Sequence, residues 1–212
     1  MIRLFLLLLV GILAAPIAFG QDNEPKRYEF YGGYAYQRAS NNADSFDRNG
    51  QASFNGASVD LIQRSQNYHG FSAEFNQNIT KHIGLVTSLT GTYSKAPYVS
   101  AVTGRTLNAS ASRYDLMFGP RYNFRLGTFN PFAEALFGFE HMRVNFSQGV
   151  TNLRDADTAF AMAFGGGLDV HVSEHFDVRA IQADYVPTFF NSKSQPNYRV
   201  GAGVKVKFGQ DP

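Results

Sequence analysis

The stretch NYRVGAGVKVKF, residues 197–208, alternates strictly between two kinds of residue. Every second residue is apolar or aromatic: Tyr198, Val200, Ala202, Val204, Val206 and Phe208. The residues between them are polar, charged or glycine, and they include Arg199, Lys205 and Lys207. A period of two is the pattern of a β-strand with one apolar face and one polar face. The fold depends on whether that apolar face meets a protein core or lipid.

Seven other segments of the 212-residue chain show the same alternation. With the last one, the predicted strands are roughly 28–37, 69–78, 83–93, 111–124, 130–143, 157–171, 176–187 and 196–208. Each is about ten residues or somewhat longer, the length of a tilted strand that crosses a membrane. The connections alternate between short turns and longer polar loops, which lie at 38–68, 94–110, 144–156 and 188–195. This predicts adjacent antiparallel hairpins with the long loops gathered at one end.

Within the predicted spans, charged residues keep to one face of the strands. That face carries Glu29, Glu74, Arg113, Asp115, Arg121, Glu134, Glu140, Asp169, Arg199, Lys205 and Lys207. A soluble lipid-binding barrel would enclose the apolar face, whereas a transmembrane barrel turns it outward to lipid. The charged face is also rich in Gly and Ala, as expected where long charged side chains share the narrow interior of an eight-stranded barrel.

Aromatic residues stand at both ends of the apolar faces. Tyr198 and Phe208 are ten residues apart, and so are Tyr114 and Phe124. Ten residues of a tilted strand rise about 25 Å, the height of the apolar band between the aromatic girdles of a membrane barrel. We therefore predict an all-β fold, an eight-stranded antiparallel transmembrane β-barrel with short periplasmic turns and longer extracellular loops.

The first twenty residues, MIRLFLLLLVGILAAPIAFG, have the pattern of a secretory signal peptide. Arg3 precedes the apolar stretch 4–13, and small residues occupy the −3 and −1 positions of a cleavage site before Gln21. The alternative is an uncleaved membrane helix, but Pro16 interrupts the apolar run. The barrel domain is then 21–212. The chain has no Cys for disulfides. The formal net charge of the mature chain is +1, the whole-chain +2 less Arg3, and this argues against a nucleic-acid partner.

The seventh strand, FDVRAIQADYVP, breaks the alternation. Arg179 falls on one face of a regular strand, whereas Gln182 and Asp184 fall on the other. A β-bulge between Arg179 and Gln182 would bring all three polar side chains to the same face. We expect such a bulge, with Arg179 as a further interior charge.

These features, with the motifs YGGYAY, PFAEALFGFEH, IQADYVPT and VGAGVKVKF, resemble the small OmpA/OmpX-like eight-stranded outer membrane protein β-barrel family. The resemblance implies a monomer in the bacterial outer membrane, in contact with outer-membrane lipid and lipopolysaccharide. It also implies a C-terminal signal read by the barrel-insertion machinery. The residues that match this signal are Tyr198, Val204, Val206 and Phe208, although GQDP follows the aromatic residue that ends the chain in the family pattern.

These residues suggest four functions as hypotheses. The interior charges would pair with one another and hold the barrel closed, or alternatively line a thin ion-conducting path. The loop 38–68 is the candidate site for an extracellular ligand. His171, Ser173 and Glu174 resemble the catalytic residues of lipid A deacylase barrels, but they lie in a short turn at the periplasmic end. We predict a structural or surface-recognition protein rather than an enzyme, with no cofactor or metal site.

Overall fold

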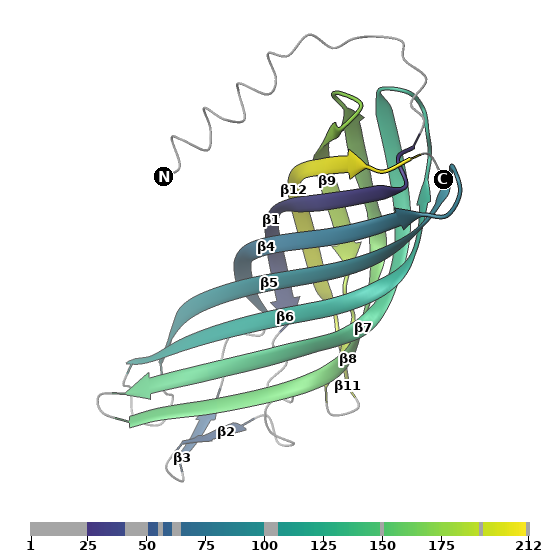
Figure 1. Cartoon of the computed structure of the whole chain (residues 1–212). Coiled ribbons are helices and arrows are strands. Elements are labelled where there is room, and N and C mark those ends of the chain that lie inside the picture. The colour runs from purple at the N-terminus through teal and green to yellow at the C-terminus, as the bar shows by residue number, and fades with distance from the viewer. Residues whose placement is uncertain are drawn as a thin grey trace, which may run out of the picture.

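The computed structural model of the chain describes residues 25–40, 51–54, 57–60, 65–99, 106–148, 151–190 and 193–210 (Figure 1). The predicted signal peptide, 1–20, lies outside these ranges. Within them, no helix is long and apolar enough to cross a membrane.

Eight long strands form a closed antiparallel barrel, as the alternation predicts. In chain order they are β1 (Tyr28–Ser40), β4 (Ser65–Asn78), β5 (Ile83–Val99), β6 (Thr106–Asn123), β7 (Phe129–Gln148), β8 (Thr151–His171), β9 (Phe176–Tyr185) and β12 (Asn197–Phe208). Each pairs with its neighbour in the chain, and β1 pairs with β12. Two short hairpins complete the structure: β2 (Gln51–Phe54) with β3 (Ala57–Asp60), and β10 (Thr188–Phe190) with β11 (Lys193–Gln195).

The stretch 197–208 is the strand that closes the barrel. Its pairing with β1 runs without a break from Tyr28 opposite Phe208 to Ala39 opposite Asn197. On its other side β12 pairs with β9. Because both sides of β12 are paired, the first and last strands meet in the barrel wall and leave no open edge there.

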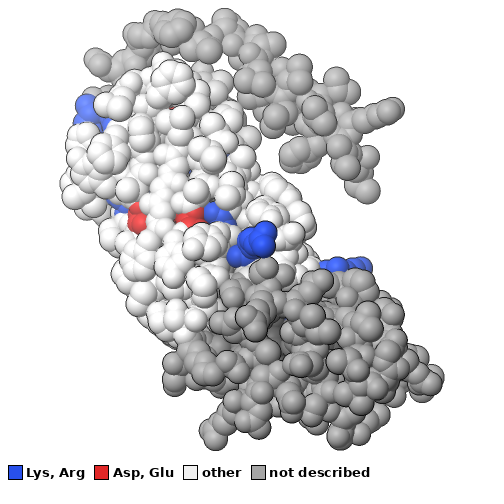
Figure 2. All heavy atoms as spheres, turned by 180° about the vertical axis from the view of Figure 1, so that it is seen from behind, with Lys and Arg blue, Asp and Glu red and all other residues white. Residues whose placement is uncertain are grey.

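The apolar faces point outward and the charged faces inward, as predicted. Phe30, Leu116, Phe118, Phe139 and Val204 are exposed on the outer surface, and the alternate residues are buried. The space-filling view shows the described part of this outer face as mostly uncharged (Figure 2). Such a surface suits lipid, because charged side chains on the outer face of a membrane barrel are destabilising.

The expected bulge lies in β9. Ala180 and Ile181 both point outward, and together they oppose the single residue Ala202 of β12. On the β8 side, Leu168 pairs with Ile181 and Asp169 with Arg179, so Ala180 is the extra residue. The extra residue restores the register, so Arg179 and Gln182 both face the interior.

The long-loop end differs from the prediction in one respect. Much of the predicted loops 94–110 and 144–156 is strand, because β5 to β8 continue beyond the other strands, toward the lower left of Figure 1. Pairing extends to Val99 opposite Thr106 and to Gln148 opposite Thr151. Polar residues occupy both faces here, so these segments lack the apolar alternation that identifies a membrane strand.

Candidate functional site: the charged interior

The ten predicted interior charges all lie inside the barrel, where each residue is at most 6% exposed. They are Glu29, Glu74, Arg113, Asp115, Arg121, Glu134, Glu140, Asp169, Arg199 and Lys205, and the two further predicted charges, Lys207 and Arg179, are buried as well. Burial of so many charges is tolerated only when they are paired and hydrogen-bonded. Their partners therefore decide what the interior does.

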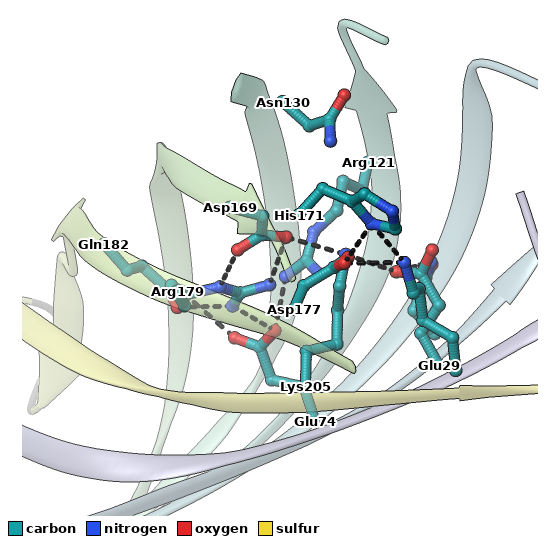
Figure 3. Close-up of polar contacts among 12 residues, drawn as sticks. Glu29, Glu74, Arg121, Asn130, Asp169, His171, Asp177, Arg179, Gln182 and Lys205 are labelled. Carbon is teal, nitrogen blue, oxygen red and sulfur yellow. Dashed lines mark hydrogen bonds and ion pairs between the residues drawn. The ribbon is translucent and has the colours of Figure 1, made fainter. Parts of the chain in front are cut away.

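Glu74 is the centre of the largest network (Figure 3). Its Oε2 accepts from Arg121 Nη2 at 2.5 Å and from Arg179 Nη1 at 2.6 Å. Arg121 also pairs with Glu134 on β7. Gln182 Nε2 lies 3.0 Å from Glu74 Oε1 and 2.9 Å from Glu134 Oε1. Arg121 and Glu134 lie on the neighbouring strands β6 and β7, whereas the contacts of Glu74 and Gln182 with these residues join strands that are not neighbours and therefore cross the interior.

Two aromatic rings pack against the arginines of this network. The guanidinium carbon of Arg179 lies 4.2 Å from the centre of the Tyr31 ring and 4.3 Å from that of Phe132. Arg121 lies 4.4 Å from the Phe132 ring. A cation over an aromatic face gains up to about 2 kcal/mol when it is removed from water. We call Glu74, Arg121, Glu134, Arg179 and Gln182, with these two rings, the central plug.

A second cluster adjoins the central plug toward the short turns. Lys205 Nζ lies 2.8 Å from Asp169, 3.1 Å from Glu29 and 3.1 Å from Asp177. Asp169 also accepts from Arg179 Nε at 2.8 Å, which links this cluster to the central plug. Arg125, from the β6–β7 turn, reaches Glu29 at 3.2 Å. One lysine therefore holds carboxylates from three strands together at this end.

A third cluster lies toward the long loops. Arg199 Nε donates to Asp184 at 3.0 Å, and its Nη1 reaches Thr90 at 2.9 Å and Asp115 at 3.4 Å. Since Asp115 lies on β6, Arg199 spans from β12 to the opposite wall. Arg113 Nε donates to Glu140 at 2.8 Å, and its guanidinium lies over the Tyr68 ring.

One interior carboxylate, Asp177 on β9, was not predicted from the sequence. Asp184 faces the interior with Arg179 and Gln182, as the expected bulge requires. A signal for Asp177 was present, because it stands two residues before Arg179 and therefore on the same face of the strand.

The stretch HVSEH (171–175) forms the β8–β9 turn. His171 Nδ1 lies 3.0 Å from Asp177 and 2.9 Å from Lys207 Nζ. The backbone of Ser173 bonds to that of Phe176, and the described contacts include no hydrogen bond between His171 and Ser173. Among the described side chains, no group of three His, Asp or Glu is placed to hold a metal ion.

The remaining predicted sites lie on the wall and in the loops. Tyr198, Val204, Val206 and Phe208 all point outward from β12. The Phe208 ring lies beside Tyr28, 5.8 Å between ring centres, at the start of β1. The loop 38–68 contains the β2–β3 hairpin, and its segments 41–50 and 61–64 lie outside the described residues.

Comparison with known proteins agrees with this architecture. Residues 5–208 match the outer membrane protein beta-barrel domain. The barrel resembles Ail of Yersinia pestis (TM-score 0.53, 17% identity, 85% of this chain and 99% of that one). It also resembles OprG of Pseudomonas aeruginosa (TM-score 0.54, 11% identity, 90% and 100%). Neisserial surface protein A gives a TM-score of 0.53 at 14% identity, over 85% and 97%.

No curated protein sequence matched the chain. Sequence identities this low to solved structures show only that the fold is shared. The match to the family domain shows membership, because it covers nearly the whole chain. The closed eight-stranded barrel, its largely apolar outer face and this match lead to one conclusion: the chain belongs to the outer membrane protein β-barrel family and resides in the bacterial outer membrane.

Proposed function

We propose that this protein is a closed outer-membrane scaffold that recognises extracellular proteins with the sheet that extends beyond its barrel. The observation that carries the proposal is the continuation of β5 to β8 past the other strands at the extracellular end. A sheet that leaves the membrane exposes strand edges to partners, and an unpaired edge can bind an extended peptide.

The interior supports a scaffold rather than a channel. The central plug joins β4, β6, β7 and β9 across the barrel, and its charged residues are at most 6% exposed. An eight-stranded barrel has room for little more than its interior side chains. Ions would have to displace paired charges in order to pass through the barrel. We therefore favour surface recognition over ion conduction as the function.

The two edges of the extended sheet differ in their capacity to bind. The β5 edge carries Lys95 and Pro97, and both residue types block the addition of another strand. On β8, the pairing with β10 reaches Phe160, and the strand runs on to Thr151 with neither Lys nor Pro in the segment 151–159. We therefore assign binding to the β8 edge.

Two loop-shortened variants test this proposal against the alternative site in loop 38–68. In the first, short turns replace 94–110 and 144–156; in the second, a short turn replaces 41–64. Cells that carry each protein are incubated on an array of immobilised extracellular-matrix and serum proteins. We expect wild type and the second variant to bind the same array proteins and the first variant to lose them.

Heat-dependent gel migration establishes that both variants retain the barrel. Loss of binding only in the second variant would move recognition to loop 38–68. Equal binding by all three proteins, or ion conduction by the wild-type barrel in a planar bilayer, would contradict the proposal.

A further inference from the structure

The third cluster of the interior, toward the long loops, contains more carboxyl groups than cations. Its acids are Asp115, Glu140 and Asp184, and its guanidiniums are those of Arg113 and Arg199. All five residues are at most 4% exposed. A buried charge without a partner of opposite sign is strongly destabilising. The cluster therefore needs one more positive charge than its own side chains supply.

The other two interior clusters are balanced. In the central plug, the two glutamates are paired with the two arginines. The second cluster pairs its three carboxylates with Lys205, Lys207 and Arg125. Each of these cations already has a carboxylate partner, so none of them supplies the charge that the third cluster needs.

Two acids of the third cluster lie directly opposite each other in the barrel wall. Asp115 of β6 pairs with Glu140 of β7, and their carboxyl groups are in hydrogen-bonding contact. Like charges at opposed positions of neighbouring strands are destabilising. Two carboxyl groups that share one buried site cannot both be ionised at low cost, so one of them keeps a proton.

The hydrogen bonds of this pair leave one oxygen free on each carboxyl group. Glu140 Oε1 accepts from Arg113 Nε at 2.8 Å, and Asp115 Oδ2 accepts from Arg199 Nη1 at 3.4 Å. Among the described residues, no donor reaches Glu140 Oε2 or Asp115 Oδ1, although both atoms are buried. Buried acceptors without a donor are rare in native proteins. A proton on one carboxyl group would supply the donor that the other lacks.

The surroundings of the pair favour a proton over a metal ion. The neutral side chains around the pair and its arginines are Gln37 of β1, Tyr68 of β4, Thr90 of β5 and Ala159 of β8. Asp184 of β9 accepts from Arg199 Nε at 3.0 Å and from Gln182 Nε2 at 3.1 Å, and such donors favour its ionised form. No three acidic or histidine side chains of the described chain are placed to hold a metal ion.

We infer that Asp115 and Glu140 share one proton in the folded barrel at neutral pH, and that release of this proton weakens the base of the extended sheet. From the pair, β6 and β7 continue outward and remain paired as far as Asn108 opposite Ser147. Loss of the proton leaves two negative charges opposite each other between these strands. Alkaline medium therefore loosens the extended sheet before it loosens the rest of the barrel wall.

Infrared spectroscopy of the full-length protein, refolded in lipid bilayers at about pH 7, tests for the proton directly. The C=O stretch of a protonated carboxyl group is resolved from the bands of carboxylates and amides. We expect this band in wild type and its loss in both Asp115→Asn and Glu140→Gln. Asp177→Asn removes a carboxylate from the balanced second cluster and should retain the band. Heat-dependent gel migration establishes that each variant is folded.

Urea unfolding between about pH 5 and pH 7 gives a second measurement. In the unfolded chain both carboxyl groups have a pKa of about 4 and are ionised, so unfolding of wild type releases the shared proton. The contribution of the proton to stability is therefore largest in acid and falls as the pH rises. For each pH unit, the unfolding constant of wild type should rise by about tenfold more than that of Asp115→Asn or Glu140→Gln.

Amide hydrogen exchange at about pH 9 tests the effect on the extended sheet. At this one pH, segments 108–112 and 143–147 should exchange faster in wild type than in Asp115→Asn, whereas β1 and β12 should exchange alike. Absence of the infrared band from wild type, its retention in both variants, or parallel pH dependences of unfolding would overturn the shared proton. Equal exchange of segments 108–112 and 143–147 in the two proteins would overturn its link to the extended sheet.

Discussion

Arg179 Nη1 donates to Glu74 Oε2 at 2.6 Å, although the two residues lie 105 positions apart in the chain. They belong to β9 and β4, which are separated in the sheet by β1 and β12. Arg179 reaches the interior because of the bulge beside it, and it is held there by two aromatic rings and by Asp169. This bond therefore depends on the register of the whole barrel.

We expect Glu74→Gln and Arg179→Gln each to lower the free energy of unfolding by about 3–5 kcal/mol, because each leaves a buried charge without its partner. The double variant should lose less than the sum, with a coupling of about 1–3 kcal/mol. Urea unfolding in detergent micelles, followed by tyrosine fluorescence, measures all four proteins.

Lys81→Gln is the matched control, since Lys81 is exposed in the β4–β5 turn and its loss should change stability by less than about 0.5 kcal/mol. Strictly additive losses for Glu74→Gln and Arg179→Gln would show that the two residues are stabilised independently.

Conduction through the barrel should depend on the central plug. Wild-type protein in a planar bilayer should give no single-channel steps. Arg121→Ala/Arg179→Ala removes the two guanidiniums packed on Phe132 and should produce steps, because it empties the centre of the barrel. Arg113→Ala, in the cluster nearer the loops, leaves the central plug in place and should stay silent. Single-channel steps from the wild-type protein would show instead that the central plug does not block ion conduction.

Most of the fold could be predicted from the sequence, and the reason is local. In β12 and β1 one face is turned to lipid and the other to a narrow interior. Apolar and polar or small residues therefore alternate along the sequence with a period of two. The bulge in β9 was detectable because Arg179 and Gln182 could not both face inward in a regular strand. The extended parts of β5 to β8 could not be predicted as strands, because polar residues occupy both of their faces and the apolar alternation is absent.

The pairing of the interior charges could not be predicted from the sequence, for a different reason. Which carboxylate Arg179 or Arg199 approaches depends on the shear of the closed barrel, which no single strand encodes. Arg199 pairs with Asp184 on the neighbouring strand but also reaches Thr90 on β5, 109 positions away. Sequence reasoning could say that these charges face one another, but not which of them meet.

Two outward-facing residues at different depths, Val204 of β12 and Ile83 of β5, test where the outer wall meets the centre of the membrane. Val204 lies on the outer face, opposite Gly32 of β1 and Val178 of β9. Val204→Lys should cost about 2–4 kcal/mol or prevent insertion. Ile83→Lys, at the start of β5 near the periplasmic surface, should cost about 1 kcal/mol or less. Equal unfolding free energies for the two variants would mean that residue 204 does not lie near mid-membrane.

Glycines leave room for the Tyr31 ring. A Cβ added to Gly203 would meet Gly32, Gly33 and the Tyr31 ring, whereas one added to Gly32 would meet only Phe30, at 4.0 Å. Gly203→Ala should therefore lower stability by about 1–3 kcal/mol through overpacking, and Gly32→Ala, across the β1–β12 pair, should be near neutral. The comparison uses urea unfolding of the two variants, and a neutral Gly203→Ala would show that the backbone of β1 at Gly32 and Gly33 can shift together with the Tyr31 ring.

Deletion of Ala180 tests whether the bulge itself, rather than the inward phase that it restores, positions the central plug. Without the extra residue, Arg179 and Gln182 stand two positions apart, so a regular β9 keeps Arg179, Gln182 and Asp184 on one face. The deletion variant should therefore refold, show heat-dependent gel migration and stay silent in planar bilayers. Ala180→Ser keeps the residue count and should fold like wild type. If the deletion variant fails to refold or gives single-channel steps, the local geometry of the bulge, and not only the inward phase, is needed to bring Arg179 to Glu74.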